Sequence, residues 1–109
     1  MNNIYDIWFA RVEVANSIKQ KVYSKFTTKE IYKLGKDDFF DLGLKEISIK
    51  KFLDNTYKNN LKEYKEYMDK NNIFQMFYND ERYPEKLRNI QNFPTYIFAK
   101  REFRFDVWR

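Results

Sequence analysis

Apolar residues recur at helical spacing near the start of the chain. Ile4, Ile7, Trp8 and Val12 follow the i, i+3, i+4, i+8 pattern that places side chains on one face of an α-helix. A second stripe with similar spacing consists of Ala15, Ile18, Val22 and Phe26. The pattern predicts two amphipathic helices, and Trp8, in the middle of the first stripe, is predicted to lie in the core.

Residues that begin and end helices mark two shorter elements further along. Thr27 and Glu30 have the spacing of a capping box, in which a hydroxyl and a carboxylate satisfy free amides of the first turn. They predict a short helix that ends at Gly35. Another turn of helix is predicted over residues 38–42, ending near Gly43.

Two more helices are predicted before residue 73. The first is expected to begin at Ser48, whose hydroxyl suits an N-cap, and to bury Ile49, Phe52 and Leu53. The second should begin near Asn60 and end at Asn71 and Asn72. Its shared face consists of Leu61, Tyr64 and Met68, and Glu66 lies four residues before Lys70 as a favourable pair.

The pattern changes after residue 72. Residues 74–78 and 96–99 are short, aromatic and apolar, and they predict two β-strands. Between them, residues 79–84 are predicted to turn, and Pro84 occupies the first position of a helical turn that ends at Ile90. The sequence therefore predicts a mainly α fold, a bundle of short helices followed by an incomplete strand–turn–strand segment.

The chain of 109 residues contains no cysteine and no histidine. Without them there is no disulfide framework, no thiolate metal site and no Ser-His-Asp or Cys-His catalytic group. Asp37, Asp38 and Asp41 resemble a carboxylate cluster, but no glycine-turned loop accompanies them, so solvent-facing or helix-capping roles are favoured. We expect no enzyme activity, no cofactor and no metal.

The N-terminal residues lack the basic segment and the apolar run of a signal peptide. No stretch of the sequence approaches the length of a membrane span. We therefore expect a cytoplasmic protein without a membrane partner.

The formal net charge is +5, and the positive residues are spread along the chain. This balance permits weak attraction to nucleic acid without requiring it. Candidate contacts on the helices are Lys50, Lys51, Lys58, Lys62 and Lys65. Because Asp54, Glu63 and Glu66 are interleaved with them, we favour a solvated face over a surface that follows a phosphate backbone.

The C-terminal residues combine positive charge with aromatic rings. Arg101 and Arg104 alternate with Phe103 and Phe105, as in proteins that stack the bases of single-stranded nucleic acid. If these residues are out of frame, the pattern is accidental, and we favour that interpretation.

The most informative segment lies between residues 80 and 100. Its spaced positions resemble a motif of the DprA/Smf family of DNA-processing proteins. The matching residues are Asp80, Tyr83, Pro84, Leu87, Ile90, Asn92, Pro94, Ile97, Phe98 and Lys100. We expect Tyr83 and Pro84 to form a structural bracket, with Tyr83 packed on the helical part and Pro84 setting the start of a helix.

The resemblance implies a division of the chain and a role. Residues 1–72 would form a SAM-like or helix-hairpin-helix-like domain, residues 73–100 the start of an incomplete Rossmann-like domain, and residues 101–109 a tail unlike the family. Full-length members are implied to handle single-stranded DNA, load the RecA recombinase and act in natural transformation. This chain would then be an accessory helical domain.

Two departures limit what the resemblance carries over. The family usually has a glycine after the position of Lys100 and then a glycine-rich loop that binds DNA phosphates, and neither is found here. We therefore expect a truncated product without the family's DNA-binding residues. The first predicted connection between helices, residues 11–17, contains Glu13 and no glycine, so DNA binding there is disfavoured.

Two alternatives stay open, a helical protein-interaction module without nucleic-acid binding and an inactive truncated product. Salt-dependent binding of nucleic acid would distinguish the DNA-handling role from the first of them. The two strands would also lack the rest of their sheet. We therefore expect a homodimer through unpaired strands, disorder beyond about residue 73, or aggregation.

Overall fold

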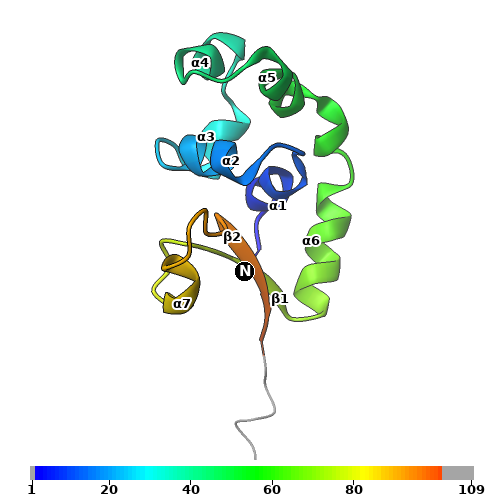
Figure 1. Cartoon of the computed structure of the whole chain (residues 1–109). Helices are drawn as coiled ribbons and strands as arrows, with labels where there is room; N and C mark the ends of the chain where they lie inside the picture. Colours follow the sequence, from blue (N-terminus) through cyan, green and yellow to red (C-terminus); the bar gives the residue numbers. More distant parts are fainter. Residues whose placement is uncertain (1, 102–109) are drawn as a thin grey trace, which may run out of the picture.

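The computed structural model describes residues 2–101. The helices before the strands are α1 (Ile4–Arg11), α2 (Asn16–Tyr23), α3 (Thr28–Tyr32), α4 (Lys36–Asp41), α5 (Glu46–Leu53), the 3-10 helix η1 (Asn55–Lys58) and α6 (Leu61–Lys70). They are followed by β1 (Ile73–Phe77), α7 (Glu85–Arg88) and β2 (Tyr96–Lys100) (Figure 1). The predicted mainly α fold is confirmed.

Helix α1 lies in the middle of the molecule and contacts α3 and α6 (Figure 1). Ile7, Trp8 and Phe9 on this helix are buried, which confirms the predicted position of Trp8 in the core. The Phe39 ring of α4 stacks on Phe52 of α5 with centroids 4.8 Å apart, and Phe52 lies 6.2 Å from Trp8. Aromatic rings therefore fill much of the core, since each buries a large apolar area.

Helix starts follow the predicted capping chemistry in one place and depart from it in another. The capping box of Thr27 and Glu30 opens α3 as predicted. Gly35 does not end that helix with a left-handed residue; it is the N-cap of α4, where its amide donates to Asp38 at 2.9 Å. Ser48 was wrongly predicted as an N-cap. The N-cap of α5 is Lys45, three residues earlier, and Ser48 is buried inside the helix, because the Lys45 carbonyl already accepts the first helical bonds.

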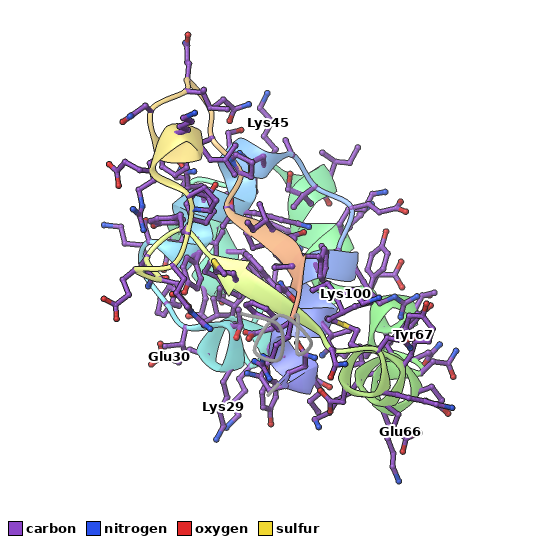
Figure 2. The ribbon with its side chains drawn as sticks, turned by 90° about the horizontal axis from the view of Figure 1, so that it is seen from below. Lys29, Glu30, Lys45, Glu66, Tyr67 and Lys100 are labelled. Atoms are coloured by element: carbon purple, nitrogen blue, oxygen red, sulfur yellow. The ribbon has the colours of Figure 1, made fainter. Side chains whose placement is uncertain are left out.

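Helix α6 buries Leu61 and Met68 as predicted, whereas Tyr64, the third residue of the predicted face, is 43% exposed. The ion pair of this helix, however, joins Lys65 to Asp69 at 2.8 Å, rather than Glu66 to Lys70. Figure 2 shows Glu66 and Tyr67 pointing away from the body of the protein. Asp69 is instead fixed from its other side by the Asn2 amide at 2.9 Å, which makes it the better partner for a lysine on the same helix.

Strands β1 and β2 pair with each other in an antiparallel hairpin. The register places Ile73 opposite Lys100 and Phe77 opposite Tyr96. The expectation that the strands have no partner in this chain is therefore wrong. For residues 73–100 the expectation of disorder is also wrong, since they form a hydrogen-bonded hairpin with its connecting loop. The tail predicted over residues 101–109 lies outside the described residues except for Arg101.

The hairpin packs against the helices. The Phe77 ring stacks on Tyr23 of α2 at 4.5 Å, and both Phe77 and Tyr96 lie 6.2 Å from Phe9 of α1. Asn16, at the start of α2, accepts from the Thr95 amide at 2.9 Å and from its hydroxyl at 2.7 Å. Helices and hairpin thus share one core. Within residues 2–101, no helix is both long enough and apolar enough to cross a membrane.

Candidate functional site

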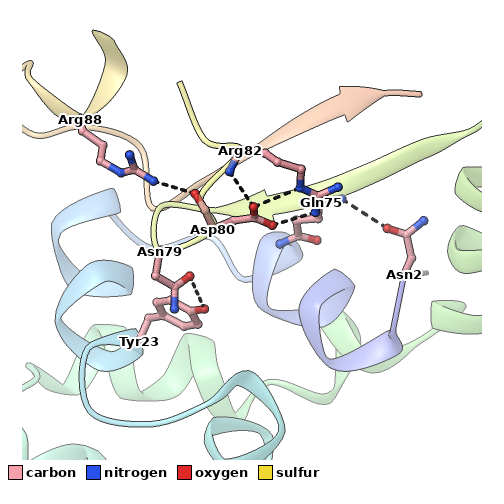
Figure 3. A network of polar contacts seen from close by, with 7 residues as sticks. All are labelled: Asn2, Tyr23, Gln75, Asn79, Asp80, Arg82 and Arg88. Atoms are coloured by element: carbon pink, nitrogen blue, oxygen red, sulfur yellow. Dashed lines mark hydrogen bonds and ion pairs between the residues drawn. The ribbon is translucent and has the colours of Figure 1, made fainter. Parts of the chain in front are cut away.

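The loop between β1 and β2 carries most of the motif, and hydrogen bonds to Asp80 hold this loop together. The Asp80 carboxylate accepts from the backbone amide of Arg82 at 2.8 Å and from the guanidinium of the same residue at 2.8 and 3.1 Å (Figure 3). These bonds from Arg82 lower the pKa of Asp80 to about 2. Asp80 is therefore an anionic anchor at neutral pH, and both of its oxygens are occupied by its own loop.

Arg88 and Tyr83 close the same loop. The Arg88 guanidinium donates to Tyr78 O at 3.0 Å and to Asp80 O at 2.6 Å. The buried Tyr83 hydroxyl donates to Pro94 O at 2.7 Å, eleven residues along the chain. The predicted structural role of Tyr83 is consistent with this bond. Its partner is a carbonyl of its own loop, however, and not the helical part of the protein.

The other motif residues do not converge on a site. Pro84 is the N-cap of α7, one position earlier than predicted. Leu87 and Pro94 are half-buried, whereas Lys100 is exposed. Ile90 and Phe98 keep about half of their surface in contact with solvent, at 50% and 53%. The motif therefore divides into residues that make hydrogen bonds within the loop, Asp80 and Tyr83, and a set of exposed side chains.

The lysines proposed as nucleic-acid contacts lie in different surroundings. Lys50 on α5 and Lys62 on α6 are exposed. Lys51 is 3.8 Å from the Glu13 carboxylate. The Lys58 ammonium sits 4.3 Å from the centre of the Tyr32 ring, a cation–π contact that covers part of the side chain.

The end of β2, which Arg101 follows, lies at the opposite end of the molecule from α5 (Figure 1). The Arg101 amide donates to Asn72 O at 2.7 Å, and its guanidinium lies 5.2 Å from the Phe74 ring. Figure 2 likewise shows Lys45, beside α5, and Lys100, beside Arg101, well apart. Arg104 lies outside the described residues. Among residues 2–101, the candidate positive residues thus do not form one continuous surface.

The turn between α4 and α5 lies where the sequence predicts a helix end near Gly43, but the sequence predicts no binding role for it. Four residues, Leu42 to Lys45, connect the two helices, and Gly43 has a left-handed backbone with φ of 86°. Short helix pairs joined by such a turn are a recurring motif in DNA-binding proteins. The family resemblance places such a connection at residues 11–17, whereas here Gly43 lies in the turn between Leu42 and Leu44.

A hollow of about 450 Å³ lies beside this turn, lined by Lys36, Phe40, Leu44, Lys45, Glu46 and Ile49. Phe40 is 71% exposed, and Ile47 on the next helix is 68% exposed. Asp38 of the predicted carboxylate cluster caps α4 through the Gly35 amide, as the capping interpretation expected. Within residues 2–101, no three acidic side chains gather in a way that could hold a metal ion.

A second hollow, of about 340 Å³, lies between the first three helices and the end of β1. Burial raises the pKa of Asp6 at its wall, although Thr28 (2.6 Å) and Asn3 (3.1 Å) donate to its carboxylate. The Tyr23 hydroxyl donates to Asn79 at 3.2 Å (Figure 3), and burial raises the pKa of Tyr23. These polar groups connect neighbouring elements, which gives them a structural function.

Lys19 is a buried cation that the sequence did not single out. Its ammonium donates to Ala10 O of α1 at 3.1 Å and to the Tyr96 hydroxyl of β2 at 2.8 Å. The Phe9 ring lies 5.7 Å away. Burial lowers the pKa of Lys19 to about 8.

Of these features, the α4–α5 turn combines exposed positive charge, free helix amides and an accessible apolar surface. Comparison with known proteins adds no assignment: no protein-family model, no curated protein and no solved structure matches this chain.

Proposed function

We propose that this chain is an accessory helical part of a cytoplasmic DNA-processing protein related to the DprA/Smf family, and that it contacts single-stranded DNA through the α4–α5 turn. The spaced residues between Asp80 and Lys100 support the family, in which DNA handling, RecA loading and natural transformation are implied. The chain itself acts in binding, not in catalysis.

The observation that carries the proposal is the free start of α5. Lys45 is its N-cap and makes no capping bond through its side chain. Within the described chain, the amides of Glu46 and Ile47 have no hydrogen-bond acceptor, since the first helical bonds begin at Ser48. Free amides beside a lysine suit a phosphate group. The carboxylate of Glu46 opposes that attraction, so the contact is weak.

The experiment is a fluorescence anisotropy titration of a labelled single-stranded oligonucleotide, repeated over a range of salt concentrations and with duplex DNA. We expect saturable binding that prefers the single strand and weakens with salt. Lys45→Ala should reduce the affinity and lower the slope of log K against log salt by about 1. The control is Lys86→Ala, an exposed lysine on α7. No binding at low salt, or equal losses in both variants, would contradict the proposal.

The second candidate is a protein-interaction module without a nucleic-acid role. The exposed Phe40 and Ile47 beside the hollow favour it, because exposed apolar side chains around a concave surface mark docking sites. RecA, the partner that the family resemblance implies, is the protein to titrate. RecA binding that withstands salt and is lost in Phe40→Ser would support this candidate. If the chain bound neither DNA nor RecA, the remaining interpretation would be an inactive truncated product.

A further inference from the structure

The two strands of the hairpin carry different hydrogen bonds on their outer edges. The hydrogen bonds from Tyr78 N to Thr95 O (3.0 Å) and from Arg101 N to Asn72 O (2.7 Å) lie at the two ends of the strand pair. They show which residues of each strand bond to the other strand. The bonding direction alternates along a strand, so alternate residues point away from the neighbouring strand. The outward backbone groups belong to residues 73, 75 and 77 of β1 and to residues 96, 98 and 100 of β2.

The outer edge of β1 is closed by other groups of the chain. The Asn2 side chain bonds to it as a strand would: Nδ2 donates to Ile73 O at 2.7 Å, and Oδ1 accepts from Gln75 N at 3.3 Å (Figure 3). The Asp80 amide donates to Phe77 O at 3.0 Å. An additional strand would have to displace these bonds, so β1 is a poor edge for pairing.

The outer edge of β2 is open. Within residues 2–101, no group bonds to the outward amides and carbonyls of Tyr96, Phe98 and Lys100. The Phe98 side chain, at the centre of this edge, is 53% exposed. An unpaired edge with an exposed aromatic ring is a template for pairing with another chain.

We propose that two copies of this chain pair through β2, antiparallel and with twofold symmetry centred on Phe98. In this register Phe98 faces Phe98 of the second copy, and Tyr96 faces Lys100. Every outward amide and carbonyl of both strands then has a partner, and the two hairpins become one continuous sheet. Because the interface uses the same surface on both copies, it closes at a dimer. The pairing does not depend on the DNA role proposed above.

Charge favours this register over the one shifted toward Lys100. A shift that placed Lys100 opposite its counterpart would bring two ammonium groups together, which destabilises a strand pair. Centring on Phe98 places each lysine beside a tyrosine and the two lysines at opposite ends of the paired strands. Each copy carries a net charge of +5, so salt should strengthen association by screening the repulsion.

Sedimentation velocity of the full chain tests the pairing, over about a hundredfold range of concentration and at low and high salt. We expect a shift from monomer to dimer with concentration, larger at high salt. Phe98→Lys should abolish the shift. Phe40→Lys is the matched control, because Phe40 on α4 is also an exposed ring, and it should dimerise like the parent. A monomer throughout, assembly beyond the dimer, or equal loss in both variants would overturn the proposal.

Cross-linking tests the register separately. The sequence has no cysteine, so one introduced thiol reports on its own counterpart. Opposed residues of a hydrogen-bonded pair have Cα atoms about 5.5 Å apart, within the reach of a disulfide. Phe98→Cys should form disulfide-linked dimers readily, whereas in Lys100→Cys the thiols lie about 14 Å apart along the strands. Equal rates in the two variants would exclude a register centred on Phe98.

Discussion

At the scale of single residues, Lys19 explains how α2 is held to its neighbours. The ammonium joins the end of α1 to the Tyr96 hydroxyl on β2 and replaces lost water by two hydrogen bonds. Burial still penalises the charge, which is why its pKa falls to about 8. The contact therefore holds three elements together, but its contribution depends on whether the amine is charged.

The free energy of unfolding should rise with pH as Lys19 loses its proton. Below about pH 8 the lysine is charged in both states, and the folded state bears the full desolvation cost. Between about 8 and the ordinary pKa of 10.5, the folded state releases its proton first, which favours folding. Over this whole pH range, the free energy of unfolding should rise by at most about 3 kcal/mol. Burial raises the pKa of Tyr96 above 10.0, so its ionisation lies in the upper part of this range or beyond it.

Urea unfolding between about pH 7 and about pH 9.5 measures this effect. Lys19→Met should lack the part of the rise that Lys19 causes, and Lys45→Met, which removes an exposed lysine, should keep it. Identical pH dependence in Lys19→Met and the parent would show that Lys19 does not titrate in this range.

At the scale of elements, the α4–α5 turn depends on Gly43. Its φ of 86° lies in the left-handed region, where a side chain clashes with its own backbone. A Cβ atom there would also lie 3.1 Å from the Lys21 ammonium, which can move aside. Backbone strain is therefore the main reason for a glycine at this position.

Gly43→Ser should lower the free energy of unfolding by about 1 to 2 kcal/mol because of this strain. Gly35→Ser is the matched control. Gly35 has a φ of −101° at the N-cap of α4, and the nearest atom to an added Cβ is 3.8 Å away. Since serine is a favourable N-cap, this variant should be neutral or stabilising. Denaturant titration of both variants is the measurement, and equal losses would argue against strain at Gly43.

At the scale of the whole molecule, helices and hairpin share a core. Phe9 of α1 contacts Phe77 and Tyr96 from the two strands, and the Asn16 side chain bonds to the loop before β2. Such contacts couple the stability of segments far apart in the sequence. The division at residue 72 stays a prediction about how these parts behave in solution.

Hydrogen exchange of the full chain can measure that coupling. Phe77→Ala removes a buried ring and should cost about 3 to 5 kcal/mol. If the core is shared, amide protection in α1 and in the hairpin should fall by similar free energies. Phe98→Ala, on the paired strand β2 but half-exposed, should have a small effect on both. Loss of protection confined to the hairpin would instead favour two separate domains.

The sequence by itself determined the local elements. The spacing of Ile4, Ile7, Trp8 and Val12 specified the buried face of α1, because the helical period alone brings those positions together. Capping in the Thr27–Glu30 box acts within one turn and was equally predictable. The strands were found within one residue from their aromatic and apolar runs, which end at turn residues.

Only the tertiary structure decided how those elements use their side chains. Lys19 is buried because Tyr96, 77 residues away, lies against it, and no local pattern encodes that contact. Ser48 was available as a cap, yet α5 begins at Glu46 and Ser48 is buried inside it. Asn2 likewise closes the outer edge of β1 from 71 residues away, whereas the outer edge of β2 is open within the described residues. Local signals act over a few residues, whereas burial, docking and free edges depend on contacts between distant ones.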